Sequence, residues 1–347
     1  MKYRAYSILK ILDMNSTKED GHGSEFGSLI TTLTVITSFL SLLGNGTVIT
    51  VMLARRRVFS SFTNRLILHQ STIDAINGLM FLLLRIVKSL NLVVSKENNF
   101  YDQLVCRVLA SDVLLWCGYV TSTYNLVLIS LERFMAICYP VKHRKMVNKH
   151  KLKIVIGVLW AISFVYNLPL LFLNAPSEGR CQITAAELNS QFLLGVVAFL
   201  IEYLAPLSII VFVYGAIFIK LKTRRDDSHN FRNQAKKNVL VTLLMISVLF
   251  VVCWTPVECG TVMLFSRDFD DDVPVVMAAM SLLISFNMIV NPIVYCFMYK
   301  QFRDQLKDVV LKRLRRNQVQ SDELQVPRHM PDPIVVIPRD SLAMAHL

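Results

Sequence analysis

The stretch LVCRVLASDVLLWCGYVTSTYNLVLISLERFMAIC, Leu104–Cys138, is a long apolar run that ends in an acid–base pair, Glu132-Arg133. At ~1.5 Å rise per residue, such a run forms a helix of roughly 50 Å, longer than the ~30 Å hydrocarbon core of a bilayer. An arginine beside a glutamate is too costly to face lipid, so the pair must face protein or the inner membrane boundary. A lone arginine there would be interpreted as a snorkelling side chain. Glu132 directly before it, and Pro140 seven residues after it, favour a specific role instead.

The chain as a whole is too apolar for an ordinary soluble protein of 347 residues. Hydrophobic residues make up 54% of the sequence, charged residues 18%, and the mean hydropathy is +0.47. Seven runs reach the ~20 residues that a spanning helix needs. They are Leu29–Leu53, Leu66–Val87, Leu104–Cys138, Ile154–Leu173, Gln191–Leu221, Val239–Phe265 and Val273–Tyr299. We therefore expect an all-α membrane protein, a seven-transmembrane helix bundle over residues 29–299.

The distribution of basic residues predicts how the bundle is oriented. A net charge of +12 would suit nucleic-acid binding, but the basic residues gather in alternate connections between the apolar runs. These connections are Arg55–Arg65, Lys142–Lys153, Lys220–Lys237 and Lys300–Arg316. This is the positive-inside pattern of a multi-pass membrane protein. It predicts a plasma-membrane protein with an extracellular tail over residues 1–28, a cytoplasmic C-terminus and no nucleic-acid partner.

The two ends of the chain differ from its apolar middle. Asn15, in the triplet NST, is an N-glycosylation acceptor in the tail expected outside the cell. Over residues 300–316, apolar side chains such as Phe302 recur at helical spacing opposite basic ones, which predicts a short amphipathic eighth helix on the membrane surface. Residues 317–347 are polar and dotted with proline, so we expect a disordered cytoplasmic tail.

Polar side chains inside the spans form a second group of candidates. Asp74, Ser122, Asn287 and Asn291 all lie at mid to inner depth of the expected bundle. An isolated carboxylate is expensive in hydrocarbon unless it is paired or solvated. Together these oxygens could hold a small hard cation with water. The alternative is an aspartate kept neutral and hydrogen-bonded to its neighbours.

At this point the residues resemble the rhodopsin-like, class A, family of G-protein-coupled receptors. The matching landmarks are Gly44-Asn45-Gly46, Asp74, Glu132-Arg133-Phe134, Trp160, Pro206 with Tyr214, Cys253-Trp254-Thr255-Pro256, Asn291-Pro292-Ile293-Val294-Tyr295 and Phe302. They cover about residues 29–316 and touch every span. Each tripeptide alone is a weak match, but their joint occurrence in this order is very specific.

The resemblance implies a switch at the inner end of the bundle. Arg133 is expected to be held by Glu132, then to release on activation and line the cleft that accepts the C-terminal helix of a heterotrimeric G protein. Tyr214 and Tyr295 look like the tyrosines that swing in to meet it. Val141, after Pro140, looks like the apolar residue that docks on the G protein.

The same resemblance assigns roles deeper in the bundle. Trp254 is expected to form the floor of the ligand pocket, with Phe250 one turn inward relaying its movement. Pro256 and Pro292 each remove a backbone hydrogen bond, so their helices can bend and pivot. Proline is also simply tolerated in membrane spans, so these kinks alone prove little.

The resemblance also implies an ion site and a disulfide bridge. Asp74, Ser122, Asn287 and Asn291 look like the family's site for an allosteric sodium ion, and no obligatory cofactor is expected. Cys106 and Cys181 look like the bridge from the third span to the second outer loop. Cys106 lies two residues further from Arg133 than is usual, which a local bulge could absorb.

Charges in the outer half of the bundle suggest the ligand's chemistry. The packing of membrane helices does not require charged side chains, yet the outer half of the bundle contains Arg85, Asp112, Glu202 and Glu258. If Glu202 and Glu258 both face inward, two carboxylates flank the pocket floor and favour a polar ligand with a cationic group. The alternative is a protonated glutamate bonded to a neighbour, or an internal ion pair with Arg85. The ligand-binding candidates are Arg85, Asp112, Leu115, Glu202, Trp254 and Glu258.

Several functions stay open or are set aside. Aminergic members of the family carry an aspartate where this chain has Leu115, so a peptide-type ligand is favoured, with a small polar metabolite as the alternative. A transporter would show related halves, and an enzyme would need a nucleophile and a base within the spans. Neither pattern is found, so the protein is expected not to be an enzyme. The expected partners are the G protein, the ligand, arrestin and the lipid bilayer.

Overall fold

The computed structural model describes residues 21–89, 95, 97, 99–109, 111–146, 148–177, 180–183, 193, 195–223, 231–266 and 273–325. By its internal contacts the chain divides into two units, residues 1–305 and 306–347. The described part of the second unit is entirely helical and ends at Gln325. Asn15 lies outside the described residues, so its glycosylation stays a prediction.

Helices dominate the first unit. Its elements are α2 (Gly21–Ala54), α3 (Phe62–Ser89), α4 (Phe100–Leu104), the π-helix η1 (Val105–Leu109), α5 (Val113–Cys138), α6 (Pro140–Met146), α7 (Lys149–Leu173), β1 (Asn174–Ser177), β2 (Arg180–Ile183), the π-helix η2 (Phe199–Leu204), α9 (Ala205–Thr223), α10 (Phe231–Ser266), α11 (Val273–Met298) and the start of α12 (Lys300–Gln325). Six helices of the described chain are long and apolar enough to cross a membrane. A seventh candidate is α11 joined to the start of α12. The expected all-α membrane bundle is confirmed.

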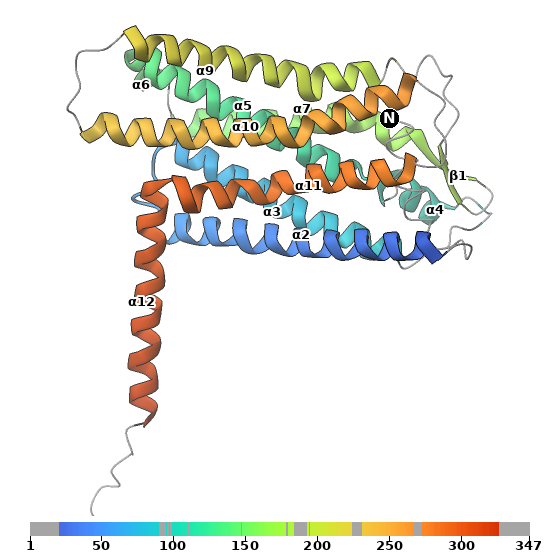
Figure 1. Ribbon diagram of the computed structural model, residues 1–347, viewed down its shortest axis with the longest axis horizontal. Coiled ribbons are helices and arrows are strands. Elements are labelled where there is room, and N and C mark those ends of the chain that lie inside the picture. Colours follow the sequence, from blue (N-terminus) through green and yellow to red (C-terminus); the bar gives the residue numbers. More distant parts are fainter. Residues whose placement is uncertain are drawn as a thin grey trace, which may run out of the picture. The chain divides into compact units, whose positions relative to one another are not determined.

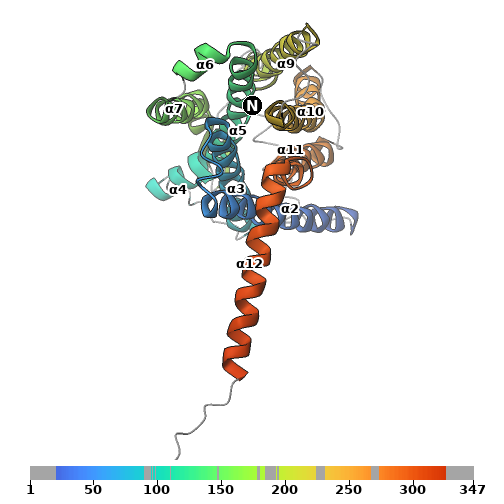
Figure 2. The same cartoon turned by 90° about the vertical axis from the view of Figure 1, so that its left-hand side faces the viewer.

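The long helices lie alongside one another, as Figure 1 shows. Viewed along the bundle, α5 lies in its middle (Figure 2), and it contacts α3, α7 and α9. Helix α2 packs against α3 and α11, and α11 in turn packs against α10. Helices α3 and α5 come so close that a Cβ added to Gly118 would lie 1.7 Å from Asn77 Oδ1. Such close approach of small residues is typical of membrane helix interfaces.

One expected boundary is wrong. Helix α2 begins at Gly21, but its candidate membrane span, Ser28–Ala54, agrees with the expected Leu29–Leu53. Helix α12 continues to Gln325 rather than ending at residue 316. Residues 317–325 therefore belong to a helix and not to the expected disordered tail. Each residue added to an existing helix gains one backbone hydrogen bond, so a helix can extend some way past its apolar face. No proline or glycine interrupts residues 317–325, and Pro327 follows them.

The expected continuous helix over Leu104–Cys138 is also wrong, because it breaks near its start. The π-helix η1 covers Val105–Leu109, and α5 starts at Val113 after a turn in which Asp112 has φ 53°. Aspartate is one of the few side chains that tolerates this left-handed conformation. The break takes up the extra residues between Cys106 and Arg133. The bulge considered from the sequence is therefore present.

A two-stranded hairpin is tied to this break. Strands β1 and β2 pair antiparallel, with Pro176 opposite Cys181. Cys181 forms a disulfide with buried Cys106, and their Cα atoms are 5.2 Å apart. The expected bridge is thus present, and it fixes the hairpin to the start of the third span.

Candidate functional site

The last turns of α5 carry Glu132 and Arg133, whose side chains pair directly. Arg133 Nε donates to Glu132 Oε2 over 2.7 Å, and Arg133 Nη2 donates to Glu132 Oε1 over 2.9 Å. The side chains are 15% and 4% exposed. A bidentate, charge-assisted contact at such a shielded site is much stronger than an exposed ion pair. The geometry is that of an arginine held by its neighbouring acid.

Two further elements donate to the same carboxylate. Thr63 Oγ1, in the first turn of α3, donates to Glu132 Oε2 over 2.8 Å. His143 Nε2, on α6, donates to Glu132 Oε1 over 2.8 Å. Each oxygen of Glu132 therefore accepts two hydrogen bonds. Glu132 joins the end of α5 to both α3 and α6.

The tyrosines expected to meet Arg133 are not hydrogen-bonded to it in the structure's described residues. Tyr295 on α11 is 1% exposed, and Tyr214 lies on α9. Within the described parts of the chain, no hydrogen bond joins either hydroxyl to the guanidinium. Arg133 is thus paired with Glu132. The hydrogen bonds to Tyr214 and Tyr295 that are expected after its release are not formed among the residues that the structure describes.

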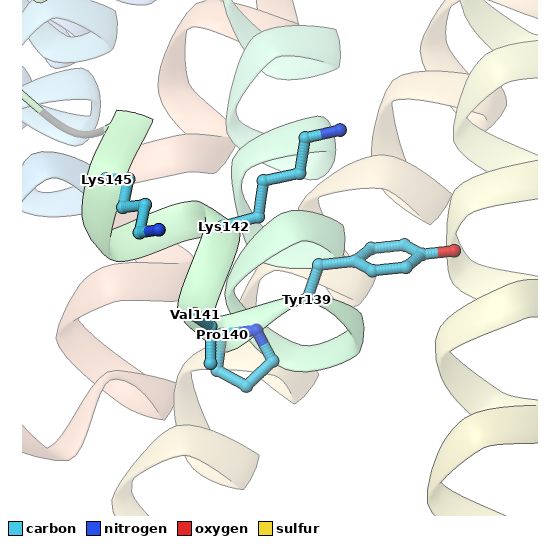
Figure 3. Close-up of a pocket in the computed structure, with 5 residues that line it drawn as sticks. All are labelled: Tyr139, Pro140, Val141, Lys142 and Lys145. Atoms are coloured by element: carbon cyan, nitrogen blue, oxygen red, sulfur yellow. The ribbon is translucent and has the colours of Figure 1, made fainter.

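A shallow hollow of about 420 Å³ lies beside this end of α5 (Figure 3). It is lined by Tyr139, Pro140, Val141, Lys142 and Lys145, on the turn into α6 and on α6 itself. Val141, the expected docking residue, is 71% exposed. An apolar side chain this exposed, in the same hollow as Lys142 and Lys145, is available to a partner surface.

Aromatic rings connect α10 with α5 deep inside the bundle. Trp254 is fully buried, and its ring centroid lies 5.6 Å from Phe250 and 6.2 Å from Tyr119 of α5. Pro256 stands inside α10, two residues after Trp254. Stacked and edge-to-face contacts at these distances stabilise by about 0.5–1.5 kcal/mol each. Movement of Trp254 must therefore displace both Phe250 and Tyr119.

Two carboxyl groups are buried toward the Asp112 end of the bundle. Glu202 is 2% exposed and Glu258 is 1% exposed. Glu202 lies in η2, and its Oε1 accepts a 2.9 Å hydrogen bond from Tyr166 Oη of α7. One oxygen of Glu202 is therefore hydrogen-bonded to a neighbouring helix, and a protonated glutamate stays an alternative.

The remaining ligand candidates occupy separate positions. Arg85 Nη2 donates to Thr31 Oγ1 of α2 over 2.5 Å. Leu115 and Asp112 are buried, at 7% and 5% exposure, on or just before the first turn of α5. The sequence-predicted residues thus come from α3, from α5 and the turn before it, from η2 and from α10.

A cluster of polar side chains surrounds Asp74 in the middle of the bundle. Its Oδ1 accepts from Ser122 Oγ of α5 over 3.0 Å, and its Oδ2 accepts from Asn291 Nδ2 of α11 over 2.6 Å. Gln70, one turn earlier on α3, donates through Nε2 to both oxygens over 3.2 and 3.3 Å. Asp74 therefore joins three helices through hydrogen bonds.

Comparison with known proteins gives a match over most of the chain. Residues 44–295 match the family described as 7 transmembrane receptor (rhodopsin family). This is well over half of the sequence. The chain belongs to the rhodopsin family of seven-transmembrane receptors. As a member of this family the protein is a multi-pass plasma-membrane receptor that signals through G proteins, and it is not an enzyme.

Individual receptors are similar to this one over most of their length. Trace amine-associated receptor 2 of Homo sapiens is 27% identical over 292 residues, covering 80% of each chain. Galanin receptor 2b of Danio rerio is 25% identical over 291 residues, covering 81% of this chain and 75% of that receptor. Somatostatin receptor type 1 of Rattus norvegicus is 26% identical over 306 residues, covering 85% of this chain and 74% of that receptor.

The receptor's polar centre does not fit the sodium ion that the resemblance implies. Asp74, Ser122 and Asn291 are brought together, but no hydrogen bond joins Asn287 to them within the described chain. The amide nitrogen of Gln70 lies 2.5 Å from Ser122 Oγ, between that oxygen and the carboxylate. An amide N–H₂ group is a donor and has no lone pair for a cation. In this arrangement Gln70 stands where the ion would coordinate.

Four contact residues of the receptor were missed from the sequence. Gln70 lies four residues before Asp74 on the same helical face, so its spacing was a usable signal. Thr63, His143 and Tyr166 donate to carboxylates on other elements. Their pairing depends on how helices pack, and the sequence carries no local sign of it.

The two motif prolines of the receptor both lie inside helices. Pro256 is in α10 and Pro292 is in α11. Pro292 is also a packing residue, because a Cβ on Gly44 would lie 2.8 Å from Pro292 Cγ. Helices α2 and α11 therefore meet closely beside Asn291.

Proposed function

We propose that this receptor binds a polar, cation-bearing extracellular ligand, most of all a peptide, and activates a heterotrimeric G protein at the Arg133 end. The observation that carries the proposal is the burial of Glu202 and Glu258 toward the opposite end. Buried carboxyl groups in a membrane bundle are retained where function needs them. A basic group on the ligand would supply the opposite charge.

The path between the two ends supports signal transmission. Glu202 lies in the π-helix η2, directly before α9, and π-helical turns are frequent at functional sites. The next residue, Tyr203, bonds through its hydroxyl to Thr255 Oγ1 of α10 over 2.5 Å. Thr255 neighbours Trp254. A ligand bound to Glu202 is therefore linked to Trp254, and so to the aromatic contact between α10 and α5, through Tyr203 and Thr255.

At the other end, the proposed partner site is the Arg133 region with the exposed Val141. Release of Arg133 from Glu132 would open a cationic surface beside an apolar side chain. That combination suits an amphipathic helix docking in a groove. Arrestin as a further partner remains a prediction from the family.

The relatives' names give a mixed indication of the ligand. Two are named for galanin and somatostatin, and one for trace amines. An amine receptor of this family is expected to place a carboxylate where this chain has Leu115. Buried Leu115 cannot anchor an amine, so the peptide class is favoured.

A screen tests the proposal. Cells expressing the receptor are exposed to matched libraries of basic, neutral and acidic peptides and of small polar metabolites, with G-protein activation as the readout. Activation by basic peptides is expected. Activation by neutral or acidic compounds alone would contradict the ligand class, and sole activation by metabolites would favour the alternative ligand.

Variants then test the carboxyl anchor. Glu202→Gln and Glu258→Gln are each expected to lower agonist potency by at least about tenfold, the effect of roughly 1.4 kcal/mol, at unchanged surface expression. Glu97→Gln, at an exposed carboxylate outside the bundle, is the matched control. Unchanged potency in both buried variants would discard the anchor.

A further inference from the structure

The side-chain amide of Gln70 occupies the centre of the polar cluster around Asp74. Its Nε2 atom lies 3.2 Å and 3.3 Å from the two carboxylate oxygens and 2.5 Å from Ser122 Oγ. A cation bridging these three oxygens would have to stand at the same place. One N–H of the amide can be shared by the two carboxylate oxygens while the other faces Ser122 Oγ, so the two hydrogens supply the positive charge density that a cation would bring.

A chain of hydrogen bonds fixes which end of the amide faces Asp74. Trp160 Nε1 can only donate, and it donates to His69 Nε2 over 3.1 Å. The proton of His69 is therefore on Nδ1, which donates to Asn125 Oδ1 over 2.9 Å. Asn125 Nδ2 in turn donates to Gln70 Oε1 over 2.8 Å. The oxygen of Gln70 is thus engaged, and its nitrogen must point to Asp74.

Because these side chains are buried, water cannot easily replace the hydrogen bonds between them. Gln70 is 2% exposed, Asp74 and Asn125 are 0% exposed, and Ser122 is 3% exposed. Buried polar groups without partners are strongly unfavourable, so every donor and acceptor in the chain holds its neighbour in place. Rotating the amide would set Gln70 Oε1 against the carboxylate and its N–H₂ group against the Asn125 donor.

We propose that Gln70 is a built-in substitute for a sodium ion. The amide satisfies Asp74 in the arrangement seen here, so the receptor does not respond to sodium. Removing the amide uncovers a site for a small monovalent cation on Asp74, Ser122 and Asn291. This proposal concerns the ion alone and does not depend on the ligand or the G protein.

Thermal unfolding of the purified full-length receptor in sodium, potassium and choline chloride at equal ionic strength tests the proposal. The parent is expected to show the same midpoint in all three salts. Gln70→Ala is expected to be less stable in choline, and its midpoint to rise by about 2–5 °C once sodium exceeds its dissociation constant about tenfold. Gln103→Ala removes a glutamine of α4 that accepts a hydrogen bond from Arg107 and, like the parent, is expected to show no difference between the three salts, whatever its midpoint.

A second substitution separates ion binding from other causes. In Gln70→Ala/Asp74→Asn the sodium response is expected to disappear, because the charged ligand is gone. If Gln70→Ala cannot be purified, Gln70→Ser, which also removes the amide, takes its place. A sodium-specific rise in the parent overturns the proposal, and so does a Gln70 variant that stays insensitive to sodium.

Discussion

Replacing Glu132 with glutamine tests whether this side chain holds the receptor closed. The carboxylate accepts hydrogen bonds from Arg133 at 2.7 and 2.9 Å, from Thr63 at 2.8 Å and from His143 at 2.8 Å. Glutamine keeps the shape but offers one oxygen and one N–H₂ group. In either orientation the N–H₂ group of the amide faces Arg133 and one other donor, either Thr63 or His143. The ion pair is also lost.

The size of the effect follows from the geometry. Hydrogen bonds to charged groups stabilise by about 1.5–3 kcal/mol, whereas exposed ion pairs contribute about 0–1 kcal/mol. Arg133 is 15% exposed. We therefore take the free energy lost from the closed state in Glu132→Gln as about 2 kcal/mol. This loss changes the ratio of open to closed receptor by roughly 30-fold. If the open state holds about 1% of the parent population, it rises to about a fifth in Glu132→Gln.

Basal nucleotide exchange on a purified G protein, without ligand, is the direct assay. At equal amounts of folded receptor, Glu132→Gln is expected to raise the basal rate by about 10–30-fold. Glu132→Asp keeps the charge and is the matched control, with a smaller increase. A basal rate equal to that of the parent in Glu132→Gln would refute the idea that this carboxylate restrains Arg133.

Three further substitutions test the fold. Cys106→Ser opens a loop of 75 residues and is expected to remove about 4 kcal/mol of stabilisation, so surface delivery should collapse; normal delivery would contradict this. Gly118→Ala places a Cβ 1.7 Å from Asn77 Oδ1 and should lower the unfolding midpoint by several degrees, at about 1–3 kcal/mol. The matched control Gly215→Ala meets nothing within 4 Å and should leave the midpoint unchanged or slightly raised. Asp112→Gly relieves the positive φ of 53°, but aspartate already tolerates this conformation, so the midpoint should stay or rise by less than the equivalent of about 1 kcal/mol; a fall would show that the buried aspartate side chain matters more.

The sequence predicts those features that a single segment carries. The apolar runs predict the membrane helices because the spanning length and the transfer free energy are properties of each run. The contact of Glu132 with Arg133 is predictable because the residues are adjacent. The bridge between Cys106 and Cys181 comes from the family resemblance, and the odd spacing of Cys106 already indicated the break that η1 and Asp112 form.

Features that depend on packing between segments are not predictable in this way. His143 reaches Glu132 because α6 folds back beside α5, and no local pattern shows that. The helical residues 317–325 cannot be predicted from apolar content, because a helix can extend beyond its apolar face. The contact of Gln70 with Asp74 is different, because residues four apart on one helix face are neighbours and their spacing is visible in the sequence.

The distribution of polar and apolar contacts indicates which helices move. Asp74 and Glu132 are both held by hydrogen bonds among α3, α5 and their neighbours, so displacing these helices would break several directional contacts at once. Helix α10 meets α5 through the rings of Trp254 and Tyr119, which are 6.2 Å apart. Aromatic contacts lose little when rings slide, whereas hydrogen bonds fail steeply with angle. Because Pro256 also removes a backbone hydrogen bond from α10, we expect this helix to move against α5 at a lower energetic cost than α3, although the bond from Tyr203 to Thr255 still ties it to η2. We therefore expect Trp254 to be the contact through which a movement of α10 reaches α5.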